Sequence, residues 1–243
     1  MFQVYDDLMK LYADHDIEVC GAYKDAAHAV LGSDRLAYAT PAMFGITTTL
    51  FSSNKMIAYN LLQNSIDEAK GAARVALIAE RHAPPELKQK MLGHVADEMK
   101  HSKQFLNLIA LTGHEAIQDP TEESHKEGAK VLDFDDDLRQ FICRVHSIEV
   151  RSWTMLRTYM SVVEKAGTPA LRDGVLPVLE DIMADEINHV LYTGKTLSDW
   201  VEQDEPHMST IMDECFGHTN KETWHDMAFM LNYLAENYDS ALG

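Results

Sequence analysis

The sequence predicts an all-α fold, a four-helix bundle of two helical hairpins joined by a long connection, with peripheral helices at both ends. From residue 54 onward, apolar residues recur at spacings of three and four, and alternating β-type runs are scarce. Proline and glycine interrupt this pattern at few places, which leaves segments long enough for bundle helices. We expect a single domain over residues 1–243, with the bundle at about 54–201 and peripheral helices in 1–53 and 202–243.

The first hairpin is expected before residue 113. The sequence SSN at 52–54 offers N-caps for a first helix that runs to about residue 81, where APP at 83–85 stops it. A proline is favoured in the first turn of a helix, so a second helix is predicted over 85–111, with a glycine just past its end.

The second hairpin follows a polar, proline-containing segment at 114–128, which with its flanks is too long for a simple turn. A third helix is expected from the acidic cluster DFDDD at 133–137 to about residue 166. The residues GTP at 167–169 break it, and a fourth helix should end near residue 201, before EQDEP.

The sequence pattern at the two ends of the chain differs from that of the predicted bundle. Residues 1–35 and 207–243 have the pattern of peripheral helices, one or two of them in the C-terminal segment. The uncharged stretch 36–54 contains a proline, a glycine and three consecutive threonines, which argue against a membrane span. We interpret it as buried chain near the core, with the lining of a pocket as the alternative.

Composition excludes several classes of function. A net charge of −18 repels nucleic acid and anionic membrane surfaces, so neither is an expected partner. Three cysteines without a CxxC pair exclude a disulfide framework, a zinc ribbon and a rubredoxin-type iron site. No secretion signal is visible at the N-terminus, and we expect a cytoplasmic protein.

The motif ExxH places a carboxylate and an imidazole on one helical face, where both can reach one metal ion. About one copy is expected by chance, and four are present: Glu98/His101, Glu122/His125, Glu186/His189 and Glu222/His225. The pair at 122/125 lies in the polar connection, and the pair at 222/225 lies in the C-terminal segment without a symmetric partner. Both are interpreted as surface groups, although helix packing is an alternative for the second.

The other two copies are each preceded by aspartate, as DEMKH at 97–101 and DEINH at 185–189, and they lie on apolar helix faces. A buried carboxylate and imidazole cost several kcal/mol unless a partner or a cation compensates them. These two motifs therefore predict a metal site.

Hairpin geometry supplies two further ligands. Residues equidistant from a turn lie at the same height in antiparallel helices, so the turn at 83–85 pairs Glu98 with Glu68. The turn at 167–168 pairs Glu186 with Glu149 in the same way. Glu80 is the rival of Glu68, but it lies too close to the turn and is expected to be exposed.

One glutamate from each of two helices plus an ExxH from each of the other two resembles the ligand set of the ferritin-like non-haem di-iron carboxylate oxidases and oxygenases. The matching positions, in chain order, are Glu68, Glu98/His101, Glu149 and Glu186/His189, within residues 54–201. In size and helix order the chain is similar to aldehyde-deformylating oxygenases and arylamine N-oxygenases. Its DExxH pairs resemble those of multicomponent monooxygenases and acyl-carrier desaturases, whose subunits are longer.

The resemblance implies a role for each position. Glu98 and Glu186 would bridge two irons, Glu68 with His101 would hold one iron, and Glu149 with His189 the other. Two aspartates, Asp97 and Asp185, stand four residues before His101 and His189 and could accept the second imidazole N–H. Manganese is an alternative metal because hard carboxylates accept either.

Two more histidines fall on ligand-bearing faces, His94 four residues before Glu98 and His146 three before Glu149. For His94 an extra ligand, a hydrogen-bond partner of a ligand and a satisfied buried histidine stay open, and the same holds for His146. The histidines His15, His28, His82, His114, His207 and His218 are left without a role beyond surface or packing.

The implied function is an enzyme, a di-iron oxidoreductase that activates O2 through a peroxo-diferric intermediate and acts on a small organic substrate, with no catalytic residue beyond the metal ligands. A ferredoxin or flavoprotein would supply electrons, and a homodimer stays open. Substrate selectivity is expected near Gly71 and Ala72. The alternatives are iron handling or peroxide removal of the ferritin or rubrerythrin kind, and a metal-free helical interaction module.

Overall fold

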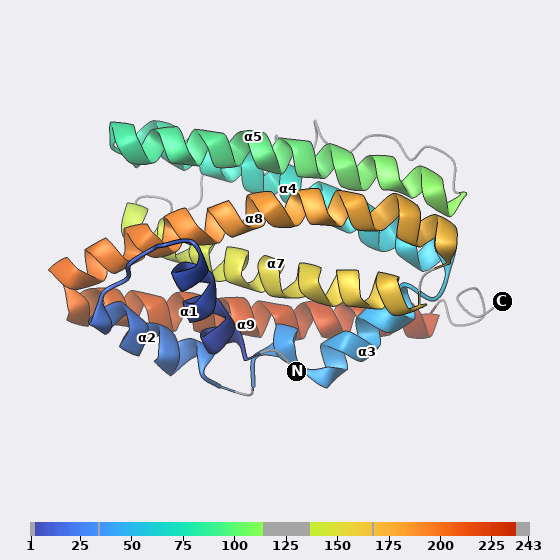
Figure 1. Ribbon diagram of the computed structural model, residues 1–243, viewed down its shortest axis with the longest axis horizontal. Coiled ribbons are helices and arrows are strands. Elements are labelled where there is room, and N and C mark those ends of the chain that lie inside the picture. Colours follow the sequence, from blue (N-terminus) through green and yellow to red (C-terminus); the bar gives the residue numbers. More distant parts are fainter. Residues whose placement is uncertain (1–2, 34, 114–136, 167, 237–243) are drawn as a thin grey trace. The chain divides into compact units, whose positions relative to one another are not determined.

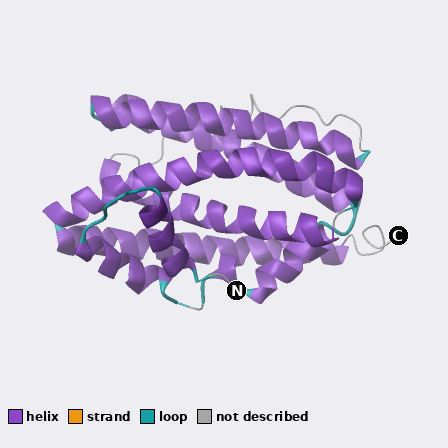
Figure 2. Cartoon of the chain, in the orientation of Figure 1, coloured by secondary structure: helices purple, strands orange, loops and turns teal. Residues whose placement is uncertain are grey.

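The computed structural model describes residues 3–33, 35–113, 137–166 and 168–236. These residues are helical with no strand among them, which confirms the all-α class (Figure 2). The α-helices of the described residues are α1 Val4–Asp14, α2 Gly21–Leu31, α3 Pro41–Leu50, α4 Asn54–His82, α5 Pro85–Leu108, α7 Leu138–Ala166, α8 Pro169–Gln203 and α9 Glu205–Glu236 (Figure 1). Two short 3-10 helices, η1 Ala37–Ala39 and η2 Ile109–Thr112, accompany them. The predicted connection, with Glu122, His125 and His114, lies outside the described residues.

The first predicted hairpin is present as α4 and α5. The Ser53 side chain accepts a hydrogen bond from the backbone N–H of Met56 (3.3 Å), so it caps α4 as expected. Pro85 is the first residue of α5. The α-helix ends at Leu108 rather than at residue 111 because its last turn tightens into η2, which Gly113 ends with a φ of +74°.

Residues 36–54 were expected to be buried chain, and much of the segment is buried, including Tyr38, Met43 and Leu50 at 1–2 % exposure. The helix α3 lies within residues 1–53, where peripheral helices were expected, although the sequence pattern did not mark this helix individually. Threonines and Gly45 lower helix propensity there, so burial of one face rather than intrinsic preference accounts for the helix. The C-terminal segment forms α9, a single helix of 32 residues.

The chain forms two compact units. Unit 1 comprises residues 1–47, 139–160 and 183–235, and unit 2 comprises 48–138, 161–182 and 236–243. Both α7 and α8 contribute residues to each unit. None of the described helices combines the length and apolarity that a membrane span requires.

Unit 2 is built around the α4–α5 hairpin. Small residues line the buried face of α4 near its centre, namely Ser65, Ala69 and Ala72, and they let the two backbones approach closely. The Ser102 hydroxyl donates to the carbonyl of Ser65 (2.8 Å), and the two hydroxyl oxygens lie 3.2 Å apart. This contact sets the register of the hairpin and places Glu68 level with Glu98, as the sequence predicts.

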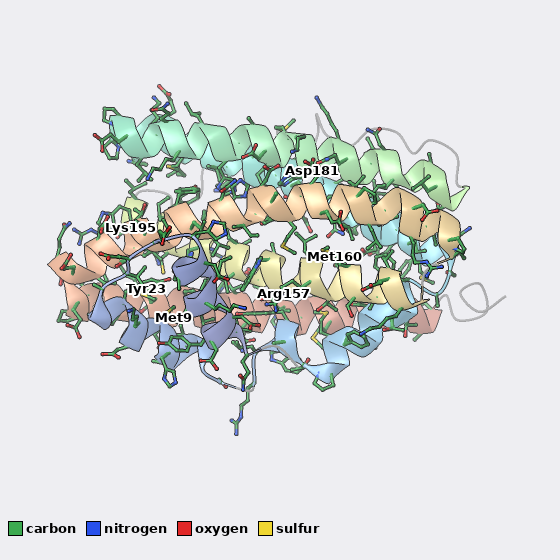
Figure 3. All side chains as sticks on the ribbon, in the orientation of Figure 1. Met9, Tyr23, Arg157, Met160, Asp181 and Lys195 are labelled. Carbon is green, nitrogen blue, oxygen red and sulfur yellow. The ribbon has the colours of Figure 1, made fainter. Side chains whose placement is uncertain are left out.

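Unit 1 gathers α1 and α2 with parts of α7 and α8 and with α9. A salt bridge joins Arg157 of α7 to Asp7 of α1 at 2.8 Å, and the same guanidinium lies 4.9 Å from the centre of the Trp153 ring. Figure 3 shows Arg157 on α7 and Tyr23 on α2. The Ser147 and Thr219 hydroxyls, 2.6 Å apart, tie α7 to α9.

Candidate functional site

Unit 2 contains a group of two imidazoles and two carboxylates. Helix α5 carries His94, Glu98 and His101 on one face at steps of four and three, and all three side chains are buried. Glu68 approaches from α4 and is half-buried. One ligand atom from each of Glu68, Glu98 and His101 lies within 4.8 Å of the others, so this group could hold a metal ion.

His94 contacts the carboxylate of Glu98 in the structure. Its Nε2 lies 3.0 Å from Oε1 of Glu98, one helical turn away, and its side chain is 2 % exposed. An imidazole at this distance holds the Glu98 carboxylate in one orientation, because few rotamers of either side chain preserve the contact. His94 is therefore a partner of a predicted ligand in unit 2.

Unit 1 contains a second group with the same chemistry. Glu149 lies on α7, and Glu186 and His189 lie on α8, all of them buried. The Nδ1 atom of His189 is 3.7 Å from Oε2 of Glu149 and 4.0 Å from Oε1 of Glu186. Oxygens of two carboxylates therefore lie within 4.0 Å of one imidazole nitrogen, and carboxylate oxygen and imidazole nitrogen are both donor types that bind metal ions.

The electrostatics of the unit 1 group disfavour the ionised form of Glu149. Burial and, next to it, the neighbouring charge of Glu186 raise the pKa of Glu149 to about 7, against the opposite effect of His189. A divalent cation would reverse this effect and keep both carboxylates ionised. The donors are carboxylate oxygen and imidazole nitrogen without thiolate, a set that suits Fe(II) or Mn(II).

The remaining predicted residues lie as follows. Asp97 and Asp185 are half-buried beside the two motifs, and their role in orienting His101 and His189 stays a prediction. Glu80 is 76 % exposed and pairs with Lys88 across the turn, as expected for a residue outside the site.

The fourth ExxH pair is at the surface, as predicted. The Glu222 side chain is 43 % exposed and contacts Arg144 and His218, and His225 is exposed. Beside Glu68, a Cβ at Gly71 would meet no atom within 4 Å, whereas Ala72 is fully buried. A side-chain carbon at position 71 would therefore meet open space, three residues along α4 from Glu68.

The comparisons with known proteins add nothing to this geometry. No family model, curated protein or solved structure matches the chain. The capacity of the two groups to bind metal therefore rests on their own donor atoms, distances and burial.

His146 belongs to a hydrogen-bond chain that sequence reasoning did not find. Its Nε2 lies 2.8 Å from the Tyr23 hydroxyl, and its Nδ1 lies 2.8 Å from the Thr193 hydroxyl. The Tyr23 hydroxyl in turn lies 2.8 Å from that of Tyr12. The periodicity of α1 and α2 marks both tyrosines as apolar-face residues, but it carries no signal that pairs them with a residue more than 120 positions away.

Burial should make His146 a measurable source of acid sensitivity. Burial lowers its pKa from 6.5 to about 3, and the side chains around its ring, Tyr12, Tyr23, Thr193 and Phe216, carry no charge. Between these two pH values the unfolded chain binds a proton that the folded chain does not. The contribution of His146 to folding stability is therefore intact above pH 6.5 and falls as the pH drops toward 3.

We expect His146→Gln to remove this part of the pH dependence. In urea unfolding of the metal-free protein, the difference in unfolding free energy between wild type and variant should change by at most about 1.4 kcal/mol per pH unit below pH 6.5. The exposed His207→Gln serves as the matched control and should show a constant difference. Parallel curves for wild type and His146→Gln would contradict the assignment.

Proposed function

We propose that the protein is an O2-activating non-haem di-iron oxidase or oxygenase that acts on a small organic substrate. The observation that carries the proposal is the group of Glu68, Glu98 and His101, whose ligand atoms lie within 4.8 Å of one another, with Glu98 and His101 buried. Glu149, Glu186 and His189 repeat the same chemistry. Buried carboxylates cost folding free energy unless a partner or a cation compensates them, and a bound metal ion would supply that compensation.

The proposal assigns both groups to one two-metal centre of a ferritin-like bundle. It rests on the order of the residues along the chain, in which each DExxH motif has a glutamate at the same height on the preceding helix. In this arrangement Glu98 and Glu186 would each help to hold the metals. His94, through its contact with Glu98 Oε1, would fix the orientation of that carboxylate before any metal binds.

Each part of the chain has a defined task in this function. When bound, iron supplies the redox chemistry with O2. The buried carboxylates bind the cations and neutralise their charge, and the apolar faces of the helices exclude water from the group. The open space at Gly71 gives a small substrate room next to Glu68. An external electron donor of the ferredoxin or flavoprotein class completes the proposal, because the chain has no CxxC redox pair.

The test is anaerobic loading with Fe(II) followed by mixing with O2. We expect two irons per chain, a transient in stopped-flow absorption, and a coupled diferric product without the EPR signal of isolated high-spin ferric ions. An isolated ferric signal would contradict the shared centre, and the absence of any O2-dependent absorption would contradict the function. Uptake of iron far beyond two per chain would instead indicate iron storage.

The chain offers a matched control for the ligand assignment. His101→Ala and His225→Ala each remove the histidine of an ExxH pair, one buried in unit 2 and one exposed on α9. We expect the first variant to lose iron and the second to keep two irons per chain. Equal iron content in both would exclude His101 as a ligand.

A further inference from the structure

The hydrogen bonds around His146 form a chain in which each group donates to the next, from Tyr12 through Tyr23, His146 and Thr193 to the carbonyl of His189. The Thr193 hydroxyl donates its single hydrogen to the carbonyl of His189 at 2.6 Å, so toward Nδ1 of His146 it can only accept. Nδ1 therefore carries the ring proton, and Nε2 presents a lone pair. The Tyr23 hydroxyl, 2.8 Å away, donates to that lone pair and accepts from the Tyr12 hydroxyl, also at 2.8 Å.

All four side chains of this hydrogen-bond chain are buried. Tyr12, Tyr23, His146 and Thr193 are each at most 1 % exposed. Burial raises the pKa of both phenols, so both are protonated at neutral pH, and the imidazole is neutral. A phenol with its proton held 2.8 Å from a neutral base can lose an electron without the phenolic cation ever forming, because the proton moves at the same time.

The two ends of this hydrogen-bond chain differ in their surroundings. One end is the backbone carbonyl of His189, a predicted metal ligand. The other end, Tyr12, lines an open pocket of about 600 Å³ together with Met9, Asp16, Ile17, Glu18 and Lys24. Gly194 makes room for this end, because a Cβ there would overlap the Tyr12 hydroxyl and lie 3.1 Å from Cε1 of His146.

We propose that Tyr12, Tyr23 and His146 form a proton-coupled redox relay between this pocket and the metal-binding group of unit 1. The proposal rests on the proposed function, because the oxidant is the metal centre after its reaction with O2. Tyr23 gives one electron to that oxidised centre, which is reduced by one electron, and gives its phenolic proton to Nε2 of His146. The product is a neutral tyrosyl radical beside an imidazolium.

Tyr12 returns the relay to its starting state. A hydrogen atom passes from its hydroxyl to the Tyr23 oxygen along their 2.8 Å contact, which moves the radical to Tyr12. A one-electron reductant at the pocket then reduces Tyr12, and the proton returns from Nε2 of His146, 3.5 Å from the Tyr12 oxygen. The net change is one electron from the reductant to the metal centre, with no net proton transfer.

The relay predicts different behaviour for two conservative variants. The iron-loaded protein is mixed with O2, frozen, and examined for a tyrosyl radical by EPR, with ring-deuterated tyrosine to identify the signal. We expect the signal in wild type and its loss in Tyr23→Phe. In Tyr12→Phe the radical should form but persist when ascorbate, a one-electron reductant, is added. Tyr38→Phe, which removes another buried tyrosine, should behave as wild type.

The proton transfer has its own readout. Formation of the radical should be slower in D2O than in H2O, and His146→Phe should lose the radical although Tyr23 is retained. A merely structural role of His146 predicts no solvent isotope effect. A radical of equal yield in wild type and Tyr23→Phe would overturn the relay.

Failure of the relay and failure of the proposed function are distinguishable. Oxidation of bound iron by O2 without any tyrosyl signal overturns the relay and leaves the oxidase function standing. If no iron is oxidised, the function fails, and the relay is tested in the metal-free protein with photogenerated tris(bipyridine)ruthenium(III). A tyrosyl signal that is lost in Tyr23→Phe then supports the relay, and a signal that Tyr23→Phe does not change overturns it.

Discussion

Glu98→Gln is expected to abolish the stabilisation that ferrous iron gives to the folded chain. Iron that binds only the folded state at 100 times its Kd stabilises it by about 2.7 kcal/mol, a rise in Tm of roughly 5–10 °C for a chain of this size. Glutamine keeps the shape of the side chain and its contact with His94 but removes the charge that binds the cation. Wild type should show the rise in differential scanning calorimetry, and Glu98→Gln should not.

The same substitution should not weaken the metal-free protein. A carboxylate that is 5 % exposed costs folding free energy when no cation compensates it, and a neutral amide removes that cost. We therefore expect the Tm of metal-free Glu98→Gln to equal or exceed that of wild type. Glu80→Gln, at an exposed position, should keep the full response to iron. An iron-dependent rise of normal size in Glu98→Gln would remove Glu98 from the ligand set.

Gly194→Ala is expected to destabilise the protein although alanine is the better helix former. Alanine normally stabilises a helix interior by roughly 0.5–1 kcal/mol relative to glycine. At Gly194 the new methyl group would overlap the Tyr12 hydroxyl and lie 2.7 Å from its Cζ, so α1 or α8 must shift. Such overpacking costs typically about 1–3 kcal/mol, and chemical denaturation should show a net loss of stability.

Two companion variants test the cause of that loss. Gly93→Ala places the same methyl group on α5 where no atom lies within 4 Å, and it should be neutral or stabilising. Adding Tyr12→Phe to Gly194→Ala removes the overlapping oxygen and should recover part of the lost stability, a coupling that a double-mutant cycle measures. Additive effects of the two substitutions would show that the loss arises elsewhere.

Local signals were sufficient to predict the hairpin that carries the unit 2 group. The Ser53 cap and Pro85 mark helix boundaries through backbone chemistry that does not depend on the rest of the fold. Equidistance from the turn then predicts which residues face each other, and the contact between Ser65 and Ser102 confirms that register. The bounds of helix α3 could not be predicted because tertiary burial overrides the low helix propensity of its threonines.

The sequence also predicted which residues form the group in unit 2, but not all of their contacts. Repetition of DExxH and the hairpin geometry identify Glu68, Glu98 and His101, and the structure brings these three together. For His94 and Glu98, the sequence predicted that they share a helical face but not that their side chains are in contact. The tyrosines of the relay were missed because periodicity predicts burial of a side chain but not its hydrogen-bond partner in a distant segment.

The arrangement of the two units along the chain has a consequence for synthesis on the ribosome. The α4–α5 hairpin is continuous in sequence and can form from local contacts while the rest of the chain is still being made. Unit 1 draws on residues 1–47 and 183–235, so its first helices must wait for nearly the whole chain to emerge. During that interval the apolar faces of α1 and α2, including Tyr12 and Tyr23, lack the residues of α8 and α9 that complete unit 1. Nascent chains interrupted before residue 183 should therefore need a chaperone, and a fragment that ends there should be prone to aggregate.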